Sequence, residues 1–531
     1  MKKTLIACAF LTGFLQVSCT DNFDALNTNP TQSSAANYDP NLLLPSIEFN
    51  SANATAGYSG AILFQSMWVQ ILSSTSSGAA TYYSNADKYV ISSNTNAYIQ
   101  TLWNSQYNAA SYAYQMEQLT AGKPALANLN AIAQLMQVQC SALITDTYGD
   151  APYTQALKAK DGTTLPAYDA QQDIYKSILA KLETATAALS PTNPLPTNDA
   201  YAYKGDVTKW KKFGYSLMLE LAMRLTKADP ATAKTYAEKA AAGGVFASAD
   251  DDAYIMADNS KGFGNNNAGA LSTLADIYSV RWSKVLIDYL KATNDPRLSI
   301  VAEVPPAGLI ANQSMSTGGN TTPAVQIGQP NGFDLNGGAT DISKAPNYPG
   351  GTGTGADITP LGKYSRPTTM YRDRNAPLFV LTYAETELLL AEAVQRGFNV
   401  PGTAASHYKN AVVAGITSLS RYGGVVNPTA AAAYADANPL VAANALKQIN
   451  EQYWATTGLQ MNFVAAWNNW KRSGFPVLTP VNYTGNFASG TIPRRQPYPN
   501  GEATLNTANY NSALGKVAGP NDWLTRMYWD K

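Results

Sequence analysis

The strongest helical pattern of apolar and polar positions lies between residues 375 and 397. Both ends of this segment carry boundary signals: Asn375 can cap a helix, Pro377 suits a first turn, and Gly397 suits a left-handed end. Apolar side chains fall on more than one side of the expected helix, which is typical of a helix buried among other helices. We therefore expect this segment to be the central element of the fold.

Three carboxylates interrupt this apolar helix: Glu385, Glu387 and Glu392. A buried charge is tolerated only when it is paired, so we expect these residues to form ion pairs with Arg or Lys. Catalysis is the alternative interpretation, because active sites also hold buried carboxylates with shifted pKa values.

Helical periodicity recurs along most of the chain and predicts a mostly α-helical fold. Further helices are expected at residues 61–72, 97–119, 126–143, 170–189, 208–226, 230–242, 272–292, 405–420, 438–456 and 459–470.

Two of the expected helix pairs, residues 208–242 and 375–420, look like repeats of one hairpin. Leu221-Ala222 in the first pair matches Leu390-Ala391 in the second. Small residues at such positions are typical of tetratricopeptide-like helix crossings, although generic helical hairpins also place Ala where helices approach closely. We expect these hairpins to form the frame of the fold.

Residues 246–374 differ from the rest of the chain, because residues 302–367 are rich in Gly, Pro, Asn and Thr. A loop region of this length inside a compact domain is usually functional or disordered. We expect a loop-rich insertion that carries short strands across one face of the helical frame.

The N-terminus has the pattern of a secretory signal peptide at residues 1–18: two lysines, an apolar run and a small residue. Cys19 follows directly, which is typical of a bacterial lipoprotein whose cysteine is lipidated, and palmitate is one acyl group we expect there. Residues 19–40 are polar and are expected to be a tether, and residues 41–531 are expected to form a single domain. Cys140 lies in an apolar helical pattern and is expected to be buried.

The composition argues against electrostatic partners. Lys and Arg together number 37 and equal the 37 Asp and Glu, so no net charge attracts nucleic acid or an anionic membrane. The chain is rich in Asn, Thr and Ser and contains 32 Tyr against 14 Phe. Tyrosine offers an apolar ring and a hydroxyl group, which suits neutral ligands rich in hydroxyl groups.

The residues offer little for catalysis. The only histidine, His407, falls on the polar side of a helix, where we expect it to be solvated. No Cys/His cluster resembles a zinc site and no Gly-x-Ser-x-Gly motif is present. A group of oxygen-bearing side chains could hold calcium or form a surface cluster at a helix start: Asp250, Asp251, Asp252, Asp258 and Asn259. Their spacing does not fit the helix-loop-helix calcium motif. We therefore expect no catalytic residue, no metal and no cofactor.

Aromatic residues on the early segment and near the long loops are the candidates for a ligand site, since sugars are bound by aromatic faces together with amide and hydroxyl groups. The candidates are Trp68, Tyr82, Tyr83, Tyr89 and Trp282. The alternative is that these rings fold back to cover the core. Five other tryptophans recur at helical apolar positions and are expected in the core: Trp103, Trp210, Trp454, Trp467 and Trp470.

A series of short motifs resembles the SusD/RagB family of outer-membrane lipoproteins of Bacteroidetes, and the motifs occur in that family's order across nearly the whole mature chain. They are Cys19 with Asn27-Thr-Asn-Pro30, the run from Asp146 to Tyr153, Lys209-Trp210, Asn294-Asp-Pro-Arg297, Tyr383-Ala-Glu385 through Gly397, Trp470-Lys-Arg-Ser-Gly474, Arg494-Arg495 and Tyr498-Pro499.

The resemblance implies a mostly helical fold with tetratricopeptide-like hairpins. It also implies a role at the outside of the cell outer membrane, where the lipid-anchored protein captures an oligosaccharide or a peptide and presents it to a SusC-like TonB-dependent transporter. The matching motifs are structural in the family, so they do not identify the residues that contact ligand. A surface glycosidase and a helical-repeat scaffold for another protein are the alternative functions.

Overall fold

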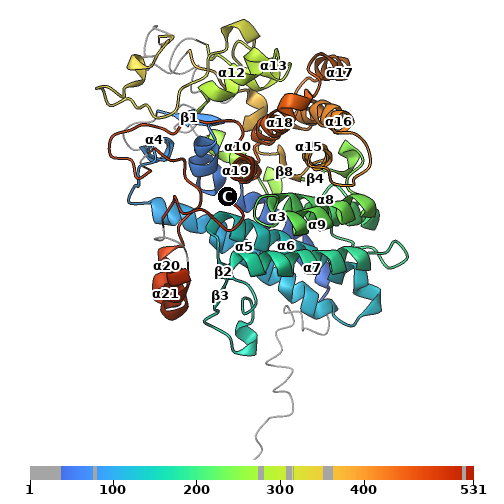
Figure 1. Cartoon of the computed structure of the whole chain (residues 1–531). Helices are drawn as coiled ribbons and strands as arrows, with labels where there is room; N and C mark the ends of the chain where they lie inside the picture. The colour runs from blue at the N-terminus through green and yellow to red at the C-terminus, as the bar shows by residue number, and fades with distance from the viewer. Residues whose placement is uncertain are drawn as a thin grey trace, which may run out of the picture. The chain divides into compact units, whose positions relative to one another are not determined.

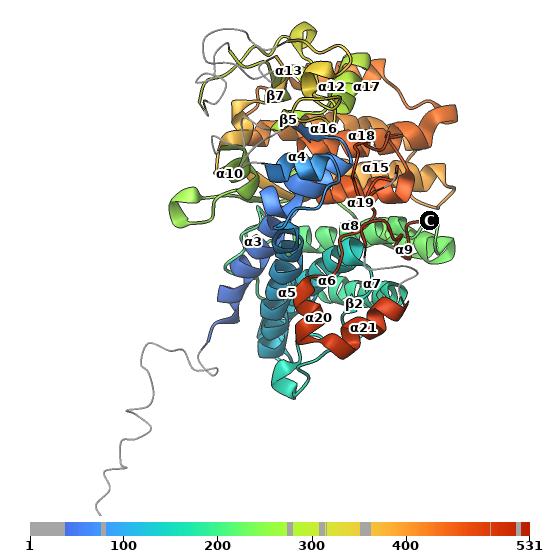
Figure 2. The same ribbon diagram turned by 90° about the vertical axis from the view of Figure 1, so that its left-hand side faces the viewer.

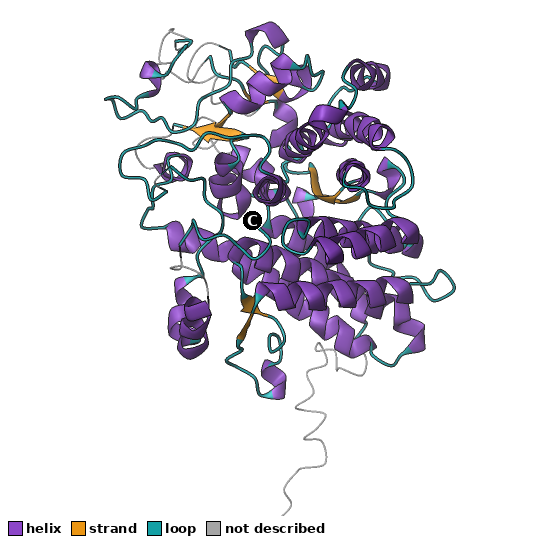
Figure 3. Ribbon diagram, in the orientation of Figure 1, coloured by secondary structure: helices purple, strands orange, loops and turns teal. Residues whose placement is uncertain are grey.

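The computed structural model describes residues 38–75, 81–272, 280–306, 314, 316–350, 363–488, 490–516 and 522–531. Residues Asn41–Lys531 form one compact unit, in which helices dominate and the strands are short (Figure 3). The mostly α-helical fold is therefore confirmed. The expected signal peptide, Cys19 and the tether up to residue 37 lie outside the described residues. Within the described ranges, every helix is too short or too polar to cross a membrane.

The helices of the first half pack mainly against their neighbours in the chain. They are α3 (Leu44–Ala54), the π-helix η3 (Tyr58–Ser66), α4 (Thr81–Asp87), α5 (Thr95–Thr120), α6 (Ala127–Tyr148), α7 (Gln171–Ala188), α8 (Val207–Arg224) and α9 (Pro230–Gly243).

The second half begins with short helices among loops and then forms a second group of longer helices. They are α10 (Asn266–Ser272), α12 (Lys284–Ala292), α13 (Leu298–Val301), α15 (Tyr383–Gln395), α16 (Ala404–Thr417), α17 (Pro428–Ala437), α18 (Ala445–Leu459), α19 (Phe463–Ser473), α20 (Asn500–Leu505) and α21 (Thr507–Lys516).

The described strands form antiparallel pairs that join distant parts of the chain. The pairs are β1 (Leu72–Ser74) with β5 (Val280–Trp282), β2 (Ala151–Pro152) with β3 (Tyr168–Asp169), β4 (Ala253–Met256) with β8 (Pro377–Leu381), and β6 (Ala302–Glu303) with β7 (Arg366–Pro367).

Consecutive helices pack as hairpins, as the sequence predicts. Figure 1 shows α5 to α9 side by side in one group and α15, α16, α18 and α19 in the other, with α8 against α15 between them. Glycines allow close approach at two crossings: a Cβ atom at Gly214 would lie 2.3 Å from Thr186 of α7, and one at Gly415 would lie 2.8 Å from Thr456 of α18. The loop-rich segments around α12 and α13 gather at one end of this frame (Figures 1 and 2).

The central helix begins later than predicted. Residues 377–381, which the pattern assigns to a first turn, form β8, and Pro377 is its first residue. Helix α15 starts after Thr382, whose hydroxyl oxygen accepts a hydrogen bond from the Glu385 amide, while the Glu385 carboxylate accepts one from the Thr382 amide at 2.9 Å. This reciprocal capping is a stronger start signal than Asn375. The predicted end is correct, since Gly397 has φ +77°.

Three other helix predictions are wrong in part. Residues 61–72 form the end of the π-helix and the start of β1. The segment 272–292 contains the end of α10, strand β5 and then α12, for which Ser283 is the cap. The segment 438–456 contains a break before α18. The short apolar stretches that form β1 and β5 cannot be told from helix by periodicity alone.

Glu392 confirms the expectation of ion pairing. Arg472 of α19 donates to both of its oxygens at 2.6 and 2.7 Å, and Arg396 donates to one at 2.7 Å. Burial alone would raise the pKa of this carboxyl, but the two guanidinium groups outweigh it and lower the pKa to about 2. The pair also meets Asn450 of α18, so it ties α15, α18 and α19 together.

The other two carboxylates differ from the expectation. Glu387 accepts hydrogen bonds from His407 Nδ1 at 2.9 Å and from Asn410. Its partner is therefore His407, whose side chain is only 13% exposed, so the prediction of a solvated histidine is wrong. Among the described residues, Glu385 has no cationic partner and bonds to Thr382 and Tyr453. Burial raises the pKa of the Glu385 carboxyl to about 8.

The buried aromatic residues include four that the sequence assigned to a ligand site. Trp68, Tyr83, Tyr89 and Trp282 are each at most 1% exposed, so protein covers the ring faces that a sugar would need. Trp68 packs against Trp467 with ring centroids 5.2 Å apart, and the Trp282 indole donates to the Val301 carbonyl at 2.8 Å. The alternative, that these rings cover the core, is the one that the structure favours. Tyr82 lies in α4, and its side chain is outside the described part.

The tryptophans expected in the core are buried, namely Trp103, Trp210, Trp454, Trp467 and Trp470. Cys140 is also fully buried, as predicted.

Replacement of Glu392 by Gln is expected to lower the free energy of unfolding by about 3–5 kcal/mol at pH 7, because it leaves the buried Arg472 without its counter-charge. The folded-state pKa of Glu392 lies below its ordinary value of 4.5. Its stabilisation, roughly 3 kcal/mol from this shift, is therefore present above pH 4.5 and is lost as the pH falls towards 2. Urea unfolding at several pH values measures both effects.

The matched control is Glu183→Gln, which breaks an ion pair with Lys239 in which both side chains are 40% exposed. This change is expected to cost less than about 1 kcal/mol. Equal effects of the two variants would show that the Glu392 pair does not hold the helices together.

Replacement of Trp282 by Ala is expected to lower the free energy of unfolding by about 3–5 kcal/mol, because it leaves a cavity in the core. Phe263→Ala is the comparison, since Phe263 is 49% exposed and its loss should cost about 1 kcal/mol. Calorimetric unfolding measures both. If the Trp282→Ala protein unfolds at the wild-type temperature but no longer binds saccharide, Trp282 is a ligand-binding residue and the core interpretation is wrong.

Candidate functional site

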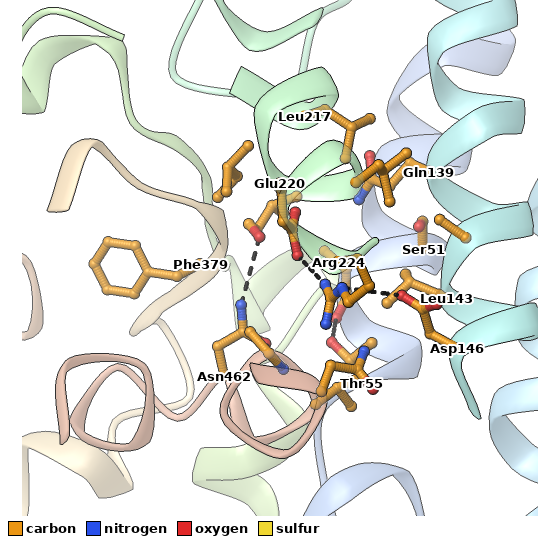
Figure 4. Close-up of a pocket in the computed structure, with 18 of the residues that line it drawn as sticks. Ser51, Thr55, Gln139, Leu143, Asp146, Leu217, Glu220, Arg224, Phe379 and Asn462 are labelled. Atoms are coloured by element: carbon orange, nitrogen blue, oxygen red, sulfur yellow. Dashed lines mark hydrogen bonds and ion pairs between the residues drawn. The ribbon is translucent and has the colours of Figure 1, made fainter. Parts of the chain in front are cut away.

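A polar chamber lies inside the frame, between α3, α6, α8 and β8 (Figure 4). Arg224 reaches Glu220 at 2.5 Å and Asp146 at 3.6 Å there. The cavity measures about 50 Å³, which leaves room for a few water molecules and none for a sugar ring. These side chains satisfy one another, so the chamber is a structural ion cluster rather than a ligand site.

A surface pocket of about 420 Å³ is the better candidate, because pockets for small ligands usually measure about 300–1,000 Å³. We call it the amide pocket after its four asparagines. It is lined by Asn50, Asn53, Ala54, Ala56, Gly57, Ser59, Thr101, Ser105, Asn108, Asn266, Gly269, Ala270 and Arg374.

Helices α3 and α5 supply two walls of the amide pocket, and Figure 2 shows them side by side with α10 above. On α3, Asn50 and Asn53 are three residues apart and share a face. On α5, Thr101, Ser105 and Asn108 follow at spacings of four and three, so they form one polar stripe. Short polar side chains on these faces leave the space open.

The third wall, α10, is fixed to the end of α3. The Gly57 amide donates to Asn267 Oδ1 at 2.7 Å, and the Asn266 amide donates to Asn53 Oδ1 at 3.2 Å. Gly57 has φ +85°, and a Cβ atom there would lie 3.0 Å from the Cβ of Asn266. Glycine is needed because both the backbone conformation and the close approach exclude a side chain.

The amide pocket offers hydrogen-bond groups that are not used inside the protein. The side chains of Asn50, Asn108 and Asn266 make no hydrogen bond to any other residue that the structure describes, and each is at least partly exposed. An amide presents one acceptor and two donor positions, which matches sugar hydroxyl groups.

An aromatic side chain stands beside the amide pocket. Phe263 packs edge-on against Phe49 of α3 with ring centroids 5.1 Å apart, and it is 49% exposed. Backbone hydrogen bonds between Asp258 and Phe263, at 2.9 and 3.0 Å, hold it on a tight hairpin that projects beside α10 (Figure 2). A half-exposed aromatic ring near amide groups offers the two kinds of contact that saccharide binding uses.

The described lining of the amide pocket lacks the side chains that acid–base catalysis uses. The lining that the structure describes contains no Asp, Glu, His or Cys. It therefore supplies no general acid, no general base and no activated nucleophile for glycosidic cleavage.

The aspartates weighed as a calcium site have other partners. Asp251 pairs with Lys212 at 2.9 Å, Asp252 lies 3.4 Å from Arg421, and Asp258 lies 2.9 Å from Lys261. Across the described residues, no group of three or more His, Cys, Asp or Glu could hold a metal ion.

Trp68, Tyr83, Tyr89 and Trp282 are not among the described residues that line the amide pocket. Sequence reasoning missed the pocket because its residues are short and polar, and such residues are ordinary on a helix surface. The one available signal was the polar stripe on α5, since Thr101, Ser105 and Asn108 share a face. That stripe alone does not show which segments lie opposite.

Comparison with known proteins agrees with the fold. A SusD-like family model, described as starch-binding and associating with the outer membrane, matches residues 32–499. The comparison with curated proteins finds no match.

Solved structures of similar fold cover nearly the whole chain. A protein described as chitin-binding is 30% identical, covers 93% of this chain and 100% of its own, and has a TM-score of 0.76. A chitin-binding SusD homolog from Flavobacterium johnsoniae is 22% identical, with coverages of 92% and 98% and a TM-score of 0.71. A SusD-like protein from Bacteroides thetaiotaomicron VPI-5482 is 20% identical, with coverages of 93% and 99% and a TM-score of 0.70. The family model and the 30% identical relative together show that this chain belongs to the SusD-like family.

Proposed function

We propose that the protein binds an oligosaccharide in the amide pocket and delivers it to a SusC-like TonB-dependent transporter. In this proposal the protein is held at the outside of the outer membrane by a lipid on Cys19. It performs no chemistry on the saccharide.

The observation that carries the proposal is the amide pocket itself. Its lining offers side-chain amides that are not used inside the protein and has no acid–base pair among the described residues, and the half-exposed ring of Phe263 lies on the hairpin that leads into α10. The family supports the same class of ligand, since its model is described as starch-binding and the 30% identical relative is described as a chitin-binding protein.

Each asparagine of the amide pocket should contribute a small part of the affinity. A hydrogen bond contributes about 0.5–1.5 kcal/mol net, which corresponds to roughly a 2- to 13-fold change in Kd. Loss of one pocket asparagine should therefore weaken binding measurably without abolishing it.

Replacement of Asn108 by Ala is expected to weaken saccharide binding roughly 2- to 13-fold, because it removes one amide from the pocket. Asn104→Ala is the matched control, since both asparagines are exposed on α5 and only Asn108 lines the pocket. Both changes should leave stability nearly equal, because Ala favours a helix. Titration calorimetry with oligosaccharides derived from starch, chitin and pectin measures the affinities.

Two results would contradict the proposal. One is equal binding by the Asn104 and Asn108 variants, which would show that the saccharide binds outside the amide pocket. The other is the absence of saturable binding for every saccharide, or the release of shorter products during incubation.

The partner and the location have their own test. Purification of the tagged protein from its native outer membrane in mild detergent is expected to recover a TonB-dependent barrel in near-equal amount. The Cys19→Ala protein should be absent from the membrane fraction, because it cannot be lipidated. Recovery of the wild-type protein alone, under conditions that keep other membrane complexes intact, would favour the scaffold or glycosidase alternatives.

A further inference from the structure

Arg374 is the one charged residue in the described lining of the amide pocket. Its side chain forms no ion pair or hydrogen bond with any other described residue, and its Nε atom is buried without an acceptor. Arg372, two residues earlier, instead donates to Glu303 at 2.5 Å. A guanidinium group that lacks a carboxylate at the wall of a pocket is available to a ligand.

The backbone of Arg374 is held in place. Its carbonyl accepts a hydrogen bond from the Asn265 amide at 2.8 Å, and the Asn265 side chain donates to the carbonyls of Ala376 and Pro377 at 3.2 and 2.9 Å. The Asn375 side chain accepts from the Asn259 amide at 3.0 Å. These bonds fix the segment to the start of α10, so the position of Arg374 is determined by the fold.

Two glycines leave space for the guanidinium group. A Cβ atom at Gly264 would lie 2.7 Å from Nη2 of Arg374, and one at Gly269 would lie 2.6 Å from Nη1. Neither glycine has a left-handed backbone conformation, so neither is required by a turn. The guanidinium group therefore lies against these two glycines, in space that the side chain of any larger residue would occupy.

Nearby carboxylates are engaged elsewhere. Asp373 accepts hydrogen bonds from the backbone and side chain of Asn375. Asp258 is paired with Lys261 and Ser260. The positive charge of Arg374 is thus not matched within the pocket lining that the structure describes.

We infer that the amide pocket selects saccharides that carry an oxyanion, either the carboxylate of a uronic acid or a sulfate ester, and that Arg374 binds this group. The planar guanidinium fork matches both oxyanions, while the asparagines bind the hydroxyl groups of the same molecule. This inference rests on the proposed function, since it names the class of saccharide for the same pocket.

The test uses titration calorimetry with the purified, detergent-solubilised protein. It compares three oligosaccharides of equal length: a neutral chitin oligomer, an oligogalacturonate, and an oligomer that carries sulfate esters on otherwise neutral sugars. At least one acidic oligomer is expected to bind about 10-fold more tightly than the neutral one, with the preference decreasing as salt is added. Preference for the galacturonate alone identifies a carboxylate ligand, and preference for the sulfated oligomer alone identifies a sulfate ester.

Arg374→Gln is expected to reduce the ratio of acidic to neutral affinity by about 10-fold, to near 1, because it removes the charged donor that binds the oxyanion. Lys261→Gln is the matched control, because Lys261 lies on the neighbouring hairpin, is 74% exposed and does not line the pocket. It should change the ratio less than about 2-fold.

Gly269→Ala gives a second variant that keeps every charge. The added methyl group should displace the guanidinium and lower the same ratio, while Ala favours the helix and preserves folding. If Arg374→Gln fails to fold, the affinity ratio of the Gly269→Ala protein tests whether Arg374 binds the oxyanion.

Two results separate failure of the inference from failure of the proposed function. Saturable binding of the neutral oligomer with no acidic preference, or equal loss of ratio in Arg374→Gln and Lys261→Gln, would overturn the inference alone. Binding of none of the three oligomers would overturn the proposed function and the inference together.

Discussion

The buried ion pair between Glu392 and Arg472 is the constraint on which the rest of the structure depends. The two side chains are only 1% and 2% exposed, and such a pair is tolerated only with complete hydrogen bonding. Arg472 satisfies both oxygens of Glu392 and also reaches Asn450, so one charge cluster fixes α15 against α18 and α19. Helix α15 follows directly after β8, with the capping residue Thr382 between them. The ion pair that holds α15 therefore also fixes β8, the strand that leads to the candidate site.

The candidate site follows from the register of that strand. Strand β8 pairs with β4, and the pairing ends at Met256 with Pro377. Two segments leave this end of the strand pair: the hairpin that carries Phe263 and the segment that carries Arg374. Asn265 joins them by donating hydrogen bonds from its side chain to the carbonyls of Ala376 and Pro377. The aromatic ring, the guanidinium group and the amides of α3 and α5 are therefore brought together by the backbone of the fold. A pocket built in this way is largely preformed, which reduces the entropy lost on binding.

The sequence predicts the frame well and the site poorly, for physical reasons. Long helices with strong periodicity, such as α5, α6 and α8, lie close to their predicted positions, and the Glu392 pair follows from the cost of burying a charge. Strand β8 was missed because Pro377–Leu381 is as compatible with a helix as with a strand, whereas the short strands expected within residues 246–374 are present as β4, β5, β6 and β7. The sequence did not show that Trp68, Tyr83, Tyr89 and Trp282 are buried, because their burial depends on how their segments pack against distant parts of the chain. The amide pocket could not be predicted, since Asn53, Asn108, Asn266 and Arg374 meet only through tertiary contacts.

The most direct test of saccharide binding in the amide pocket is the crystal structure of the protein with a bound oligosaccharide. We predict that the saccharide lies between α3, α5 and α10, with a sugar ring against Phe263 and hydrogen bonds to Asn108. A saccharide bound elsewhere, for example among the loops near Tyr364 or beside Trp103, with the amide pocket empty, would contradict this prediction.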